Sequence, residues 1–104
     1  MKWAEMIRVR SSAAGIADLN NELPRVMAIL RQKSEFEDAF LLIHALYSGD
    51  LAVILIWNGT GKPGKTPDGI LLANNFEEYG TVEHAVWLIA SNGLGPGEET
   101  GKNI

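Results

Sequence analysis

The 104-residue sequence predicts an α+β domain with the element order β-α-β-β-α-β and a four-stranded antiparallel sheet. The apolar runs 40–47 and 51–57 are joined across Ser48-Gly49-Asp50, which is typical of an antiparallel hairpin. On each side of this hairpin, a segment with apolar residues at three- and four-residue spacing adjoins a further strand-like run. This order is the split βαβ pattern of ferredoxin-like folds.

The first strand is predicted over residues 2–10, where Glu5 shares a face with apolar side chains. A helix follows, and a serine pair is suited to cap its start. Pro24 cannot donate a backbone hydrogen bond inside a helix. Either the helix kinks there, or a second helix begins at Asn20 or Asn21. The polar segment 31–38 is predicted to connect this region to the hairpin.

The second helix is predicted to begin at Thr66-Pro67-Asp68, which combines a capping threonine, a first-turn proline and an acidic residue. Gly80 is the expected left-handed residue at its end, and residues 81–90 form the last strand. The predicted apolar stripe of this helix consists of Ile70, Leu71, Ala73, Phe76 and Tyr79.

We expect one domain over residues 1–90 and a flexible glycine-rich tail over residues 91–104. The absence of cysteine excludes thiolate catalysis and iron–sulfur sites and fits a reducing compartment, so the cytoplasm is the expected location. No apolar run approaches the roughly 20 residues that span a membrane. With a net charge of -4 and scattered basic residues, neither nucleic acid nor a membrane is an expected partner.

Both faces of the predicted sheet are apolar, because neither hairpin strand alternates apolar with polar residues. Right-handed crossovers place the first and third strands in the middle of the sheet and both helices on one face. Each large apolar side chain left exposed on the other face forgoes about 1.5 to 3 kcal/mol. We therefore expect a second copy of the chain to cover that face, forming a homodimer.

A split βαβ chain of this size, with a sheet apolar on both faces and Trp57 closing the third strand, resembles the dimeric α/β-barrel superfamily. Antibiotic-biosynthesis-monooxygenase-like proteins are its best-known members. The resemblance covers residues 2–90 and implies that two sheets pack face to face as a barrel, with a small-molecule pocket between each sheet and its helices. Haem-degrading members carry a histidine on the helix after this tryptophan, whereas residues 67–79 contain none. Haem degradation is not expected, and neither is any other cofactor.

With Gly49-Asp50 as a two-residue turn, His44 is predicted to lie opposite Leu55 and on the same face as Trp57. A histidine beside an indole among aliphatic side chains is typical of an apolar pocket with few polar groups. His44 is the candidate catalytic residue, and a half-buried structural histidine is the alternative. The candidate substrate pocket consists of Trp57, Leu42, Leu55 and Phe76.

Two acid–base residues lie outside this predicted pocket. Glu5 is either a buried functional carboxylate or a solvated residue near a strand end. His84, on the last strand, is separated from His44 by three inter-strand spacings of roughly 4.8 Å, too far to share a metal ion within one subunit. No metal site is expected.

The segment 59–66, Gly-Thr-Gly-Lys-Pro-Gly-Lys-Thr, satisfies the P-loop pattern between a strand and a helix. Pro67 has no N–H to offer a phosphate, and the preceding strand belongs to a hairpin, so nucleotide hydrolysis is not expected. A plain flexible loop is one alternative, and weak anion binding is the other. The candidate anion-binding residues are Gly61, Gly64, Lys65 and Thr66.

Two functions therefore stay open. The first is a homodimer that binds a small apolar ligand, or that oxidises an aromatic or polyketide-like compound without a cofactor, with His44 as the base. The second is a non-catalytic module that recognises a metabolite or a protein. Direct packing of Leu30, Ile70 or Phe76 onto Trp57 and His44 would favour the second.

Overall fold

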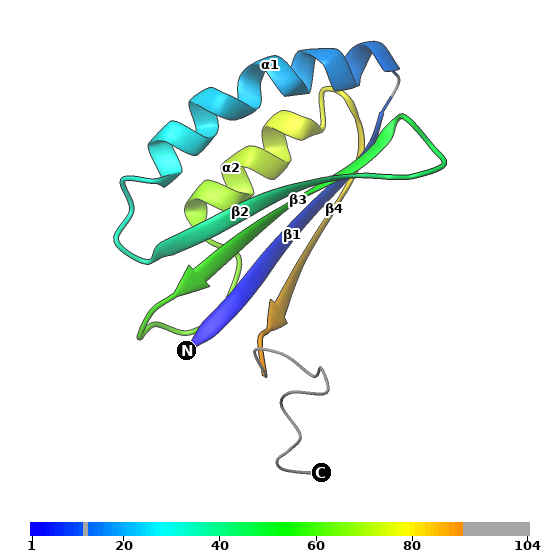
Figure 1. Cartoon of the computed structure of the whole chain (residues 1–104). Coiled ribbons are helices and arrows are strands. Elements are labelled where there is room, and N and C mark those ends of the chain that lie inside the picture. The colour runs from blue at the N-terminus through cyan, green and yellow to red at the C-terminus, as the bar shows by residue number, and fades with distance from the viewer. Residues whose placement is uncertain (12, 91–104) are drawn as a thin grey trace.

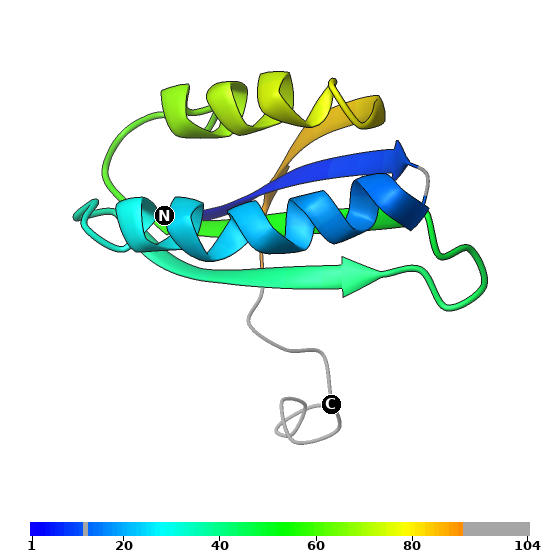
Figure 2. The same cartoon turned by 90° about the horizontal axis from the view of Figure 1, so that it is seen from above.

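The computed structural model describes residues 1–11 and 13–90, so the predicted tail lies outside the described residues. Their elements are β1 (Lys2–Ser11), α1 (Ala13–Leu30), β2 (Phe36–Ile43), β3 (Asp50–Asn58), α2 (Pro67–Phe76) and β4 (Gly80–Leu88) (Figure 1). The antiparallel sheet has the spatial order β2-β3-β1-β4. Both helices lie on the same side of the sheet (Figure 2). The predicted ferredoxin-like α+β fold, with β1 and β3 in the middle, is confirmed.

Helix α1 runs through Pro24 as a single element, so a second helix does not begin at Asn20 or Asn21. Because Pro24 has no N–H, it cannot donate to the Asn20 carbonyl one turn earlier. Ser11 is the last residue of β1, and Ser12, the other residue of the predicted capping pair, lies outside the described residues. Among residues 1–11 and 13–90, no helix is both long and apolar enough to cross a membrane.

The register of the β2–β3 hairpin differs from the prediction. Leu55 pairs with Ala39 in place of His44, a difference of five residues. Because side chains alternate between the two faces of a sheet, an odd shift transfers the side chains of residues 38–43 to the opposite face, whereas a bulge between Phe36 and Asp38 keeps Phe36 on the side of Trp57. β2 also begins at Phe36, within the segment predicted as a polar connection.

The turn after β2 explains this shift. The Nδ1 atom of His44 accepts hydrogen bonds from the main-chain N–H groups of Leu46 and Tyr47, at 3.0 and 3.2 Å. The N–H of Asp50 then donates to the Tyr47 carbonyl at 3.0 Å. These local bonds turn the chain directly after His44, so residues 44–49 form a longer connection than the predicted two-residue turn.

Helix α2 begins as predicted and ends earlier. The Thr66 side chain caps it by accepting from the Gly69 N–H at 3.0 Å. The helix ends at Phe76, and its C-cap residue Glu77 has a right-handed conformation, so Gly80 does not terminate the helix. Gly80 instead opens β4, where a Cβ atom would lie 1.7 Å from the Arg10 carbonyl oxygen. Close approach of two main chains, and not a left-handed turn, therefore requires glycine there.

The two faces of the sheet differ in cover. The helix-facing side forms the core with α1 and the buried side of α2, which consists of Gly69, Leu72, Ala73 and Phe76. Ile70 and Leu71, predicted for this stripe, are exposed. The other side carries apolar residues that no element within residues 1–11 and 13–90 covers, including Phe40, Leu42 and Trp87, which are 50%, 53% and 60% exposed. We call this side the open face.

Candidate functional site

A fully buried carboxylate, Glu5 of β1, lies on the helix-facing side of the sheet. Its Oε1 atom accepts hydrogen bonds from Trp57 Nε1 of β3 at 2.8 Å and from the Thr66 hydroxyl at 2.6 Å. Its Oε2 atom accepts from the Thr66 main-chain N–H at 3.1 Å and lies 2.7 Å from His84 Nε2 of β4. The carboxylate therefore joins β3, β4 and the start of α2.

The surroundings of Glu5 are those of an anion site. An ionised carboxylate offers about four acceptor positions, and the contacts to Trp57, Thr66 and His84 fill them. The start of α2 adds the positive end of the helix dipole. Gly69 in its first turn makes room, because a Cβ atom there would lie 1.9 Å from Glu5 Oε2. Buried carboxylates require such pairing, since an unpaired charge is costly to bury.

The bond to Glu5 orients the His84 ring. The other partners of this carboxylate supply hydrogens, so we assign the hydrogen of the Nε2 contact to His84, which leaves Nδ1 as the second nitrogen. Among the described residues, Trp3 Nε1 is the buried side-chain nitrogen or oxygen that lacks a partner. His84 Nδ1 is not such an atom, and the His84 side chain is 9% exposed. A histidine held by a carboxylate is a typical arrangement for a base.

The structure does not bring His44 to Trp57. His44 follows β2 in an exposed connection, where its ring lies 4.8 Å from that of Tyr47. Leu42 lies on the open face, whereas Trp57, Leu55 and Phe76 belong to the core. His84 is the histidine that shares a partner, Glu5, with Trp57. The signal for this site in the sequence was the single carboxylate on the apolar face of the first strand.

Some hydrogen-bond donors of the predicted anion-binding loop are already used within the protein and are not available to a ligand. Both the N–H and the hydroxyl of Thr66 bond to Glu5, so the anion at the start of α2 is a side chain of the protein itself. Gly61 and Lys65 are exposed, and no atom lies within 4 Å of a Cβ built at Gly61 or Gly64. Within the described ranges, no group of three or more His, Asp and Glu side chains is placed to hold a metal ion.

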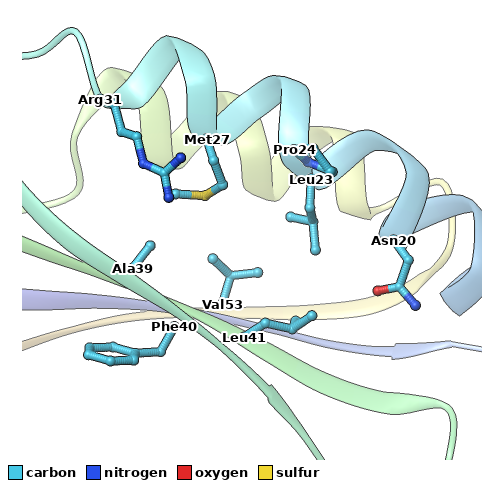
Figure 3. A pocket seen from close by; sticks show the side chains of 9 residues that line it. All are labelled: Asn20, Leu23, Pro24, Met27, Arg31, Ala39, Phe40, Leu41 and Val53. Carbon is cyan, nitrogen blue, oxygen red and sulfur yellow. The ribbon is translucent and has the colours of Figure 1, made fainter.

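A groove of about 430 Å³ lies between α1 and β2 (Figure 3). Leu23, Met27 and Arg31 project towards the sheet, and Asn20 lies at the other end of the row. The sheet contributes Ala39, Leu41 and Val53, while the Phe40 ring lies on the far side of β2. Leu41 is on the helix-facing side, opposite Val53, yet it is 42% exposed. The helix layer therefore leaves this edge of the sheet incompletely covered.

The side chain of Tyr79, the residue before β4, bonds to helix α1. Its hydroxyl donates a hydrogen bond to Glu22 of α1. That bond, together with partial burial and the negative charge of Glu22, raises the pKa of Tyr79 from 10.0 to about 12. The neutral phenol is therefore favoured in the folded protein. Its contribution to stability is complete below the ordinary tyrosine pKa and is lost as the pH rises through about 12.

Tyr79→Phe is expected to remove the late step of the ultraviolet phenolate titration and to lower stability at neutral pH. Its unfolding free energy is also expected to depend less on pH between about 10 and 12, the interval between the two pKa values. Tyr47→Phe is the control, because Tyr47 is 65% exposed. Loss of the late step in Tyr47→Phe, and not in Tyr79→Phe, would contradict the assignment.

The chain has the ferredoxin-like α+β fold, and two solved structures share it, so the resemblance seen in the sequence is confirmed at the level of fold. The chain is similar to a variant of SnoaB, a cofactor-independent oxygenase from Streptomyces nogalater, with a TM-score of 0.68 and 15% identity over 88% of this chain and 95% of that chain. It is also similar to Rv0793 from Mycobacterium tuberculosis, with a TM-score of 0.67 and 14% identity over 88% of this chain and 98% of that chain. No protein-family model and no curated protein matches the chain. At these identities, the likeness establishes the fold alone.

Proposed function

We propose that the protein is a homodimer that binds a small apolar molecule, of an aromatic or polyketide-like class, in the groove between α1 and β2. The groove itself carries this proposal. Its volume of about 430 Å³ falls within the range of roughly 300 to 1,000 Å³ that ligand pockets occupy. Its walls are largely apolar, with Asn20 and Arg31 as polar residues, which is the composition of a small-molecule site.

The core around Trp57 supports binding at the groove in preference to the pocket predicted from the sequence. Trp57 is 4% exposed and belongs to one buried cluster with Leu30 and Phe76. The Phe36 ring packs edge-on against it, with ring centroids 5.5 Å apart. This packing agrees at Trp57 with the arrangement expected for a non-catalytic binding module, whereas His44 lies outside the cluster.

The open face supports the homodimer. Phe40, Leu42 and Trp87 are half exposed or more, and Ile54 and Ile56 lie between them on β3. Contiguous apolar surface of this kind is typical of an interface. Phe40 belongs both to this face and to the lining of the groove. A second copy on the open face would therefore also border the groove at Phe40.

A native mass spectrum of the purified full chain tests the assembly, and a calorimetric screen of polycyclic aromatic compounds tests the binding. We expect a dimer, and compounds that bind the wild type but not Ala39→Trp, because the larger side chain would fill the groove. Ala28→Trp, at an exposed position of α1 outside the groove, should bind normally. A monomer would contradict the first expectation, and equal binding by both variants would contradict the second.

Cofactor-free oxidation is the second candidate function, and the bond between Glu5 and His84 favours it. SnoaB, which shares the fold, is described as a cofactor-independent oxygenase. His84 Nδ1 would take a proton from an acidic O–H or C–H group, and the Glu5 carboxylate would stabilise the resulting imidazolium. Dioxygen would then oxidise the carbanion or phenolate, placing one oxygen atom in the product and releasing the other as water with two substrate hydrogens.

Oxygen consumption with polycyclic phenols tests this second candidate. His84→Asn is expected to abolish consumption, because the amide keeps a hydrogen-bond donor for Glu5 but cannot act as a base. His44→Asn, in the exposed connection after β2, is the matched control and should consume oxygen at the wild-type rate. An unchanged rate in His84→Asn would overturn the assignment.

A further inference from the structure

We infer that the ligand of the groove between α1 and β2 is an elongated molecule with a terminal carboxylate, which Arg31 binds. This inference rests on the proposed binding of a small apolar molecule in the groove, and it names an extended carboxylate-bearing chain as the ligand class in place of a compact polycyclic compound. Three observations carry it: the position of Arg31, its lack of an ion-pair partner among the described residues, and the polarity of the two ends of the groove.

Arg31 is a cation without a partner in the described part of the chain. Several other basic residues are paired, among them Arg8 with Asp50 at 2.7 Å, Lys2 with Glu37 at 2.8 Å, and Lys33 with Asp68 at 3.8 Å, whereas the remaining unpaired ones do not line this groove. Arg31 makes no such ion pair within residues 1–11 and 13–90, and its side chain projects from the end of α1 towards the sheet (Figure 3). No acidic side chain lines the groove. A guanidinium in this setting is suited to bind a carboxylate through two parallel hydrogen bonds.

The opposite end of the groove offers acceptors. Asn20 lines it, and its main-chain carbonyl lacks the donor that any residue other than proline would supply at position 24. The side-chain amide of Asn20 adds a donor and an acceptor. A hydroxyl group of the ligand would bind there, so the two ends of the groove select different polar groups.

The spacing along α1 sets the shape of the ligand. Asn20 and Arg31 are eleven residues apart, which is roughly 16 Å along a helix at 1.5 Å per residue. Leu23, Met27 and Val53 form the apolar middle of the groove. A compact ligand cannot reach both ends, whereas an extended apolar chain with a carboxylate at one end can.

Dodecanoate is the probe, and its neutral methyl ester is the matched control ligand. Both are titrated into the full chain by calorimetry at neutral pH, below the concentration at which dodecanoate forms micelles. We expect dodecanoate to bind about tenfold more tightly than the ester, the smaller end of what a charge-assisted pair contributes. Arg31→Gln should remove this difference without changing the affinity for the ester. Arg25→Gln, on the same helix but facing the cavity between α1 and α2, should behave as wild type.

The outcomes separate the two proposals. If acid and ester bind equally to the wild type and Ala39→Trp still abolishes both, the groove is a binding site but Arg31 does not select a carboxylate. If an advantage for the acid persists in Arg31→Gln, another group binds the carboxylate and the inference is wrong. If neither probe binds and the aromatic screen also finds nothing, the proposed binding function fails as well.

Discussion

Replacing Glu5 by alanine is expected to lower the free energy of unfolding by about 3 to 5 kcal/mol, the effect of removing one member of a buried, hydrogen-bonded charge network. The Trp57 N–H would be left in the core without an acceptor, and each buried polar group left unpaired costs about 1 to 3 kcal/mol. The Thr66 and His84 contacts would be lost at the same time. Urea unfolding followed by tryptophan fluorescence, at one fixed protein concentration, measures the change.

Glu83→Ala is the matched control for this prediction. Glu83 lies on the neighbouring strand β4, its side chain is 66% exposed, and its bridge to Arg8 is 3.4 Å long. Removing it should change the free energy of unfolding by no more than about 0.5 kcal/mol. Since a domain of this size has a stability of only about 5 to 15 kcal/mol, Glu5→Gln provides a milder variant of similar volume. Equal stability of Glu5→Ala and Glu83→Ala would show that Glu5 does not hold the network together.

Gly69→Ala is expected to destabilise the protein by about 1 to 3 kcal/mol, the usual cost of forcing an extra group into a packed site. Helix propensity alone predicts the opposite sign, because alanine is favoured over glycine in a helix by about 1 kcal/mol. The reason for the reversal is the position of the new Cβ atom, 1.9 Å from Glu5 Oε2 and 2.6 Å from Glu5 Cδ. The carboxylate could move only by giving up bonds to Thr66 or His84. Urea unfolding again measures the effect.

Two further variants make this prediction specific. Gly64→Ala should be nearly neutral, because no atom lies within 4 Å of a Cβ built at Gly64. In a protein that already carries Glu5→Ala, the clash is absent, so adding Gly69→Ala should no longer destabilise. If Gly69→Ala stabilised the otherwise unaltered protein, Glu5 would not be seated against the first turn of α2.

Much of the architecture was predictable because it depends on local patterns. The alternation in β1 placed Glu5 on the same face as Trp3, Ile7 and Val9, and all four are buried together. The Thr66 cap and the first-turn proline located the start of α2 correctly. These features depend on residues within a few positions of one another, so a single sequence is sufficient to predict them.

The candidate sites were less predictable because they depend on register and on partners far apart in the chain. The His44 side chain accepts two main-chain hydrogen bonds in its own turn, and the hairpin register differs from the predicted one by five residues. His44 and Leu42 therefore do not lie on the side of Trp57. The groove exists because the helix layer leaves Leu41 partly uncovered, which no local pattern indicates.

The sequence by itself determined the kinds of elements, their order, the faces of β1 and the excess of apolar side chains on the sheet. Hydrophobic periodicity and turn chemistry act between near neighbours, and these features follow from them. Only the tertiary structure decided that Glu5 bonds to His84, 79 residues away, and to Thr66, 61 residues away. A buried carboxylate must find donors wherever the packed chain brings them, so its partners are fixed by strand register and helix placement.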